Sequence, residues 1–288
     1  MKRMVYRADD IGYTKAFDEG ALKAIDEGIA TAADVMFDSY NTVNALIELR
    51  KRPWISLGWH RHLWNRPVLS PEEVPSLVDE EGRFKWRHRH PELMEEATYE
   101  DCLKEFRAEM ALCLEYYGRY PDTANIKDSE LPLEKAFRDV VLECGINYEV
   151  YRNKYCTFVP EQLRENVTRI FPGGPNGLLV NGLGYYDLRN FKEYDPAGDI
   201  MAHHWENDEQ VLRAGGHPGY LDEFVMAESS CNIHRPKELQ ACLSEELKQW
   251  IISNKIELVN YRDIINGTHE YQDHLKEINS PLWAGNFK

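Results

Sequence analysis

Runs of residues that favour strands alternate with runs that favour helices along this 288-residue chain. The first strand ends at Asp9–Asp10, and residues 14–27 are expected to form a helix, residues 30–37 a strand and residues 41–51 a second helix. Such alternation implies parallel strands joined by right-handed crossovers. We therefore expect a single α/β domain over residues 1–288, either a (β/α) barrel or an open doubly wound sheet.

The alternation continues beyond residue 51, with one long interruption. Residues 63–97 form an insertion rich in Pro, Trp and basic residues, and loops of this length are usually lids or binding loops. The turn-rich residues 151–194 cannot be assigned. The remaining expected strands are 54–60, 123–126, 146–150, 199–205, 210–220 and 256–261, and the remaining expected helices begin near residues 98, 133 and 244.

Composition excludes several classes of partner. The net charge of −15 argues against nucleic acid, which needs a basic surface. No apolar run reaches the roughly 18 residues of a membrane span, and residues 1–10 lack the apolar core of a signal peptide. Six cysteines without CxxC spacing favour buried free thiols, so we expect a cytoplasmic protein with no membrane partner, with a homodimer as the commonest oligomer.

Polar side chains cluster where the expected strands end. These clusters are Asp9-Asp10, His60-Arg61-His62, Lys127-Asp128, His203-His204 and His217. Chemistry in such folds collects at the carboxyl ends of the strands, and acids meeting imidazoles there suit a divalent metal with an adjacent base. No phosphate-binding glycine loop and no nucleophile motif is present.

The adjacent acids Asp9 and Asp10 are the most specific of these clusters. Successive side chains of a regular strand point to opposite faces, so both can reach one site only through a kink or bulge. Two carboxylates that close repel each other unless a cation or shared proton intervenes. A solvated turn with a capping Asp remains the alternative interpretation, and only one of His203 and His204 can face inward from a regular strand.

Five segments together resemble the YdjC-like family of carbohydrate deacetylases. They are ADDIGYTKAFDEGALKAIDEGIATAADVM, LGWHRHL, RPVLSPEEVPSLVDEEGRF, GGHPGYLDE and IELVNYRDI, in the order of the family. The resemblance implies a distorted (β/α) barrel of the polysaccharide-deacetylase type and one divalent metal, Mg²⁺ or Zn²⁺. It also implies hydrolysis of an N-acetyl group on a small amino sugar or oligosaccharide.

The resemblance also assigns roles to four residues of this sequence. Asp9 matches the general base, and Asp10 matches a metal ligand. His60 matches a metal-binding histidine. His217 matches the histidine that acts as general acid or stabilises the tetrahedral intermediate.

Two further residues are expected to bind substrate. Arg235 matches a recurrent arginine that helps to build the family's site, and His62 lies one side chain further along the rim from His60.

Trp59, Trp64 and Trp86 are candidates for packing against a sugar ring, although burial in the core is the commoner fate of each. The basic run 83–90 is either a solvated loop or an anion-attracting lip.

One departure from the family pattern affects the metal site. The family places another histidine ligand after its middle strand, where this chain reads TANIKDSELP. Asp128 or Glu130 could substitute as an oxygen ligand, which favours Mg²⁺, or Lys127 could replace the charge of the metal. Loss of catalysis would leave a carbohydrate-binding protein, and a hydrolase of another amide or a phosphoester is a third possibility.

Overall fold

The computed structural model describes residues 1–85, 96–127, 129–151, 167–170, 189, 191–205, 207–229 and 231–287. Its centre is a parallel sheet of eight strands in the order β5-β4-β3-β2-β1-β7-β6, with β8 paired to β1 beside this path. The strands are β1 (Arg3–Ile11), β2 (Ala32–Val35), β3 (Ser56–Trp59), β4 (Thr123–Lys127), β5 (Asn147–Tyr151), β6 (Val167–Ile170), β7 (Val211–Gly216) and β8 (Glu257–Leu258).

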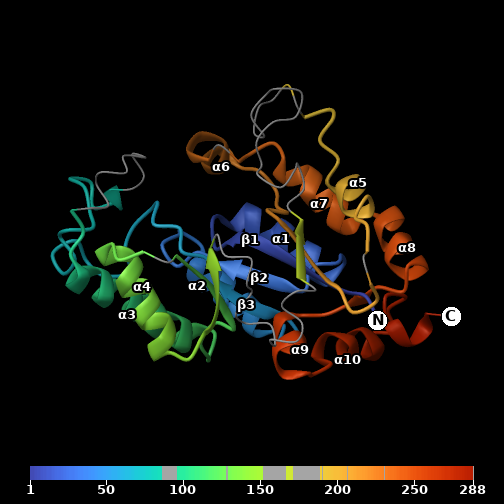
Figure 1. The fold of residues 1–288 in the computed structure, drawn as a ribbon. Helices are drawn as coiled ribbons and strands as arrows, with labels where there is room; N and C mark the ends of the chain where they lie inside the picture. Colours follow the sequence, from blue (N-terminus) through green and yellow to red (C-terminus); the bar gives the residue numbers. More distant parts are fainter. Residues whose placement is uncertain are drawn as a thin grey trace.

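Helices flank this sheet, with α3 and α4 packed beside each other on one side and α5, α7 and α8 grouped on another (Figure 1). The helices are α1 (Lys15–Asp26), α2 (Thr42–Arg50), α3 (Tyr99–Tyr116), α4 (Pro132–Glu143), α5 (Pro196–Met201), α6 (Glu223–Glu228), α7 (Arg235–Leu243), α8 (Glu245–Ser253), α9 (Tyr261–Asn266), α10 (Glu270–Glu277) and the short 3₁₀ helix η5 (Ala284–Asn286). No helix in the described ranges is long and apolar enough to cross a membrane.

The expected helix starts at Thr14, Thr98 and Ser244 are confirmed by their side-chain caps. Thr14 accepts a hydrogen bond from the Phe17 amide at 3.2 Å, and the other two cap α3 and α8 in the same way. Each cap satisfies an amide that the first helical turn leaves without a partner.

The curl of the sheet is seen in an ion pair across its interior. Arg213 on β7 pairs with Glu149 on β5, two strands on opposite sides of the central β1–β2 pair. Both side chains are largely buried. A flat sheet would hold these strands far apart, so the contact agrees with the distorted (β/α) barrel, and the expected fold class is confirmed.

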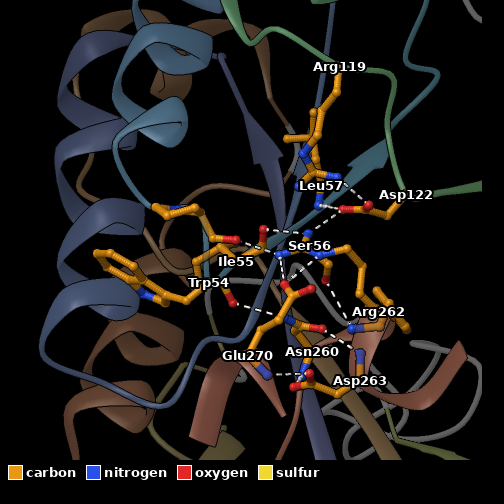
Figure 2. A network of polar contacts seen from close by, with 12 residues as sticks. Trp54, Ile55, Ser56, Leu57, Arg119, Asp122, Asn260, Arg262, Asp263 and Glu270 are labelled. Atoms are coloured by element: carbon orange, nitrogen blue, oxygen red, sulfur yellow. Dashed lines mark hydrogen bonds and ion pairs between the residues drawn. The ribbon is translucent and has the colours of Figure 1, made fainter. Parts of the chain in front are cut away.

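A polar network fastens the amino-terminal end of the barrel (Figure 2). Strand β8 and strand β2 occupy the same edge of β1, with β8 opposite Arg3 and β2 opposite Arg7 and Ala8. Beyond β8, the side-chain amide of Asn260 donates to the Trp54 carbonyl at 2.9 Å. The chain that follows β8 is thereby joined to the start of β3.

Arg262 extends this network. Its guanidinium donates to the Ile55 carbonyl at 3.0 Å and to Asp122 at 2.8 Å, and Asp122 also accepts from the Leu57 amide at 2.7 Å. These contacts lie at the starts of β3 and β4, away from the carboxyl ends that carry the polar clusters. This end of the barrel is therefore built for stability.

Two sequence-based expectations are wrong. Residues 199–205 do not form a strand, because Asp195 caps and Pro196 opens helix α5, which runs to Met201. The last strand is limited to Glu257–Leu258, because Asn260 already caps α9 in a capping box with Asp263. Strand β6 lies in the turn-rich segment where no element could be assigned.

The described part of the 63–97 insertion is fastened to α3. Glu105, fully buried on α3, accepts hydrogen bonds from the Val68 and Leu69 amides at 2.6 and 3.1 Å. Asp101 accepts from the Ser76 amide at 3.0 Å. Residues 86–95, which carry most of the basic run and Trp86, lie outside the described residues, so a lid function stays a prediction.

Candidate active site at the carboxyl ends of the strands

A bulge at the end of β1 brings both adjacent acids to the same rim. The pairing between β1 and β2 shifts register between Ala8 and Ile11, and Asp10 has the left-handed φ of 65°. Gly12 follows with a φ of 99°. The bulge re-aims one side chain, which confirms the expected kink and lets Asp9 and Asp10 serve one site.

The repulsion between these two carboxylates is relieved by separate cations. Asp9 accepts a hydrogen bond from Arg7 at 2.8 Å, and both side chains are buried. Asp10 Oδ2 accepts from Arg235 at 2.7 Å, and its Oδ1 lies 3.2 Å from His60 Nε2. Burial favours protonation of Asp10, but Arg235, His217 and His60 outweigh it and hold its pKa well below the usual value.

Asp34 on β2 is a third buried acid of the site, which the sequence analysis missed. Ala33 pairs with Ala8, and Asp34 follows opposite the bulge, with a ligand atom within 4.8 Å of one on Asp9. The Asp34 carboxylate is 3.1 Å from Arg7 and 3.8 Å from His60 Nδ1. The signal available in the sequence was a single acid inside the apolar run of residues 30–37.

Gly58 on β3 makes room for this acid. A Cβ at position 58 would stand 1.9 Å from Asp34 Oδ1, so a side chain there would displace the carboxylate from this position. Asp34 Oδ1 is buried and has no hydrogen-bond partner among the described residues.

The donor set fits a divalent cation. One ligand atom each from Asp9, Asp34 and His60 lie within 4.8 Å of one another, and carboxylate oxygens with an imidazole nitrogen are ordinary ligands of such ions. The unpartnered Asp34 Oδ1 is an oxygen that a cation could satisfy. Asp10 and His60, the predicted ligand pair, offer an alternative set of metal ligands. The two ring nitrogens of His60 face different acids, Nε2 facing Asp10 and Nδ1 facing Asp34.

Two carboxylates next to His60 favour the protonated form of its imidazole. Burial disfavours its charge, but hydrogen bonds to Asp10 and Asp34 outweigh burial and raise its pKa to about 10. A cation that binds at His60 therefore has to displace this proton.

His217, at the end of β7, is held by Glu238 of α7. The Glu238 carboxylate accepts from the His217 backbone amide and lies 3.4 Å from His217 Nδ1. Its other oxygen accepts from the Tyr194 hydroxyl at 2.6 Å. Burial disfavours the imidazolium, but Cys231, Asp10 and Glu238 raise the pKa of His217 well above its ordinary value.

One face of α7 supplies both supports of the site, Arg235 for Asp10 and Glu238 for His217. Residues three apart share a helix face, so the spacing of these two residues was a signal that the sequence analysis overlooked for Glu238. Cys231, His217 and Glu238 do not make a nucleophilic triad. Cys231 and Glu238 both contact Nδ1, whereas a triad needs its acid and its nucleophile on different nitrogens.

Arg235 and His62, the predicted substrate-binding residues, have different surroundings. Arg235 is 1% exposed and lies over the rings of Tyr13 and Phe17, with its cation directed to Asp10. His62 is partly exposed, and its Nδ1 lies 3.5 Å from Asp38. His62 is exposed enough to contact a ligand, whereas the Arg235 guanidinium contacts Asp10, and both assignments stay predictions.

The residues proposed to replace the family's missing histidine do not converge on His60. Lys127 pairs with Glu134 at 3.3 Å. Glu130 is 80% exposed and pairs with Arg138 at 3.1 Å. Asp128 lies outside the described residues.

The other candidate residues have different surroundings. Trp59 is buried and donates to Glu109 at 2.6 Å, so it belongs to the core. Trp64 is partly exposed beside His62, with 6.0 Å between the ring centres. His203 and His204 follow α5 and do not end a strand.

The comparisons with known proteins agree with this architecture. A protein named carbohydrate deacetylase from Clostridium beijerinckii is 26% identical over 91% of this chain and 100% of its own length. A protein of the same name from Brevibacillus brevis is 27% identical over 91% of this chain and 99% of its own.

A solved structure shows the same fold. It is that of an Enterococcus faecalis V583 protein named for cellobiose-phosphate cleavage, with a TM-score of 0.64 and 22% identity over 91% of this chain and 98% of that one. The family model described as YdjC-like protein matches residues 3–253, most of the chain. This chain therefore belongs to the YdjC-like family.

Proposed function

We propose that this protein is a carbohydrate deacetylase that removes an N-acetyl group from a small amino sugar or oligosaccharide with the help of a divalent metal ion. The observation that carries the proposal is the convergence of acids and an imidazole from distant segments at one rim: Asp10 contacts His60 and Arg235, and ligand atoms of Asp9, Asp34 and His60 lie within 4.8 Å of one another. The names of its relatives give the substrate class.

The metal would be held by His60 with Asp10, or with Asp9 and Asp34, and would supply a Lewis acid for the acetyl carbonyl and for the attacking water. Where His60 and Asp10 hold the metal, Asp9 is the base that takes a proton from the water as it attacks the carbonyl carbon. The Arg7 guanidinium fixes the Asp9 carboxylate in place for this step.

His217 completes the reaction as the general acid. It enters the cycle as an imidazolium, because Cys231, Asp10 and Glu238 raise its pKa. It donates this proton to the departing nitrogen as the C–N bond breaks. The products are the free amino sugar and acetic acid, which ionises to acetate at neutral pH, and the proton taken by Asp9 balances the one given by His217.

A carbohydrate-binding protein without catalysis is the second candidate. It is favoured by the ion pairs of Lys127 with Glu134 and of Glu130 with Arg138, which leave the metal without a further ligand from these residues. In that case sugar binding persists and acetate release is absent.

Acetate release from N-acetylglucosamine and its β-1,4-linked disaccharide, with Mg²⁺ or Zn²⁺ present, tests the proposal. We expect release by the wild-type protein and a loss of about 10²–10⁴-fold in kcat for Asp9→Asn, because the general base is removed. Asp26→Asn, which removes an exposed acid paired with Arg52, is the control and should keep its activity. Release by neither the wild-type protein nor the control would refute the proposal.

A further inference from the structure

A row of aromatic rings leads away from His60 along the rim. The ring of His62 lies 6.5 Å from His60 and 5.9 Å from Tyr13. Tyr13 lies 5.7 Å from Phe224 on α6, and Phe224 lies 4.9 Å from Tyr40. We call Tyr13, Phe224 and Tyr40 the aromatic rim; it is continuous with the candidate active site through His62.

Tyr40 is the exposed end of this rim, and folding does not account for its position. The residue is 56% exposed, although a tyrosine ring is stabilised by burial. It lies in the loop between β2 and α2, whereas Tyr13 is 3% exposed and belongs to the buried core.

The loop that carries Tyr40 is held rigidly. Asp38 accepts hydrogen bonds from the Trp64 and Asn65 amides at 2.6 and 2.9 Å, which joins this loop to the segment after β3. The Thr42 hydroxyl donates to the Met36 carbonyl at 2.6 Å. An exposed aromatic ring on a fixed backbone is a preorganised contact for a ligand, because binding then costs little conformational entropy.

The chemistry of the rim suits a sugar ring. The C–H face of a pyranose is apolar and packs on the electron-rich face of an aromatic ring, while its hydroxyls stay in water. Asp222, Glu223 and Glu228, on or next to α6, place negative charge beside Phe224 and disfavour a phosphorylated sugar.

Building on the proposed function, we propose that the aromatic rim is a subsite for the second sugar of a neutral N-acetylated disaccharide or longer oligosaccharide, with Tyr40 as its exposed contact. Tyr40 is separated from His60 by three intervening rings. In this arrangement the acetyl group of one sugar lies at His60, and a further sugar of the same substrate packs at Tyr40.

The test compares N-acetylglucosamine with N,N′-diacetylchitobiose in the wild-type protein, Tyr40→Ala and Tyr40→Phe. We expect Tyr40→Ala to lower the ratio of kcat/KM for the disaccharide to that for the monosaccharide by about five- to tenfold, through KM, because one ring contact is lost. Tyr40→Phe keeps the aromatic ring and should therefore keep the ratio of the wild-type protein. Tyr120→Ala, at an exposed tyrosine before β4 at the other end of the barrel, is the matched control and should leave the ratio unchanged.

Calorimetric titration with the same two sugars separates the subsite from the reaction. If the wild-type protein releases no acetate, the proposed function fails, and a Kd for the disaccharide that is five- to tenfold weaker in Tyr40→Ala still supports the subsite. An unchanged Kd, equal losses for both sugars, or no disaccharide binding by the wild-type protein would overturn it.

Discussion

Arg7 has an unusual position for an arginine, inside the barrel between two acids of the site. It donates to Asp9 at 2.8 Å and lies 3.1 Å from Asp34. Burial disfavours its charge, but Asp34 and Asp9 outweigh burial and raise its pKa further above its already high ordinary value. Arg7 thus supplies to these two carboxylates the positive charge that a metal ion would otherwise supply.

Arg7→Met tests this role. We expect a loss of about 3–5 kcal/mol in the free energy of unfolding, because two buried carboxylates then lack their counter-charge. Divalent metal should recover part of this loss, since Asp9, Asp34 and His60 could then bind a cation together. Urea unfolding with and without Mg²⁺ measures both effects.

The control for this prediction is Arg107→Met, which breaks an exposed ion pair with Glu143. Exposed pairs contribute about 1 kcal/mol or less. If Arg7→Met costs no more than this control, the buried cluster does not depend on Arg7.

At the scale of elements, helix α1 is attached to the turn that carries the paired acids. Asp18 on α1 accepts from the Gly12 amide at 2.8 Å and from the Asn41 side chain at 2.7 Å. It therefore joins the end of β1 to the start of α2. Burial raises the pKa of Asp18 to about 7, because its partners are neutral and oppose burial only in part.

This shift predicts how stability depends on pH. The folded protein holds the Asp18 proton up to about pH 7, whereas the unfolded chain releases it near 3.8, so the contribution of this group to stability falls as pH rises between these values. Asp18→Asn, which cannot ionise, should lose this fall. Between pH 5 and pH 8 the free energy of unfolding should drop by on the order of 2 kcal/mol less in the variant than in the wild-type protein.

Urea unfolding at both pH values measures the difference. Glu19→Gln, at the next residue of the same helix but exposed, is the control and should follow the wild-type protein. A variant whose stability falls with pH as steeply as that of the wild type would exclude Asp18 as the source.

The elements were predictable where local chemistry fixes them. Thr14, Thr98 and Ser244 cap helices through their own side chains, so a few neighbouring residues hold the whole signal. Strand β8 was overestimated because its two residues are defined by pairing with β1, a contact distant in sequence.

The site residues, too, were predictable from local sequence and were missed where distant contacts define them. Asp10 and His60 were predictable because they end apolar runs, and the structure brings them within 3.2 Å. Asp34 and Glu238 were missed because the role of an acid inside a strand or a helix depends on which residue the fold places opposite it. The fold places His60 opposite Asp34 and His217 opposite Glu238.

At the scale of the whole molecule, the barrel supplies cations to the acids of its own rim. Arg7 on β1 and Arg235 on α7 neutralise the paired acids, while neighbouring carboxylates raise the pKa of His60, which follows β3, and of His217, which follows β7. We therefore expect the fold to persist when the metal ion is removed by a chelator. We also expect metal binding to release protons.

The number of protons released when a metal ion binds can be measured. Below the His60 pKa of about 10, a metal ion that binds its nitrogen releases one proton, so the apparent affinity should rise about tenfold per pH unit between pH 7 and pH 9. Calorimetry in buffers of different ionisation enthalpy gives the number of protons released. We expect about one in the wild-type protein and in His269→Asn, a control at an exposed histidine far along the chain, and weak or no binding in His60→Asn. An affinity independent of pH, with no proton released, would mean that the ion binds without His60 and that the acids of the rim alone hold it.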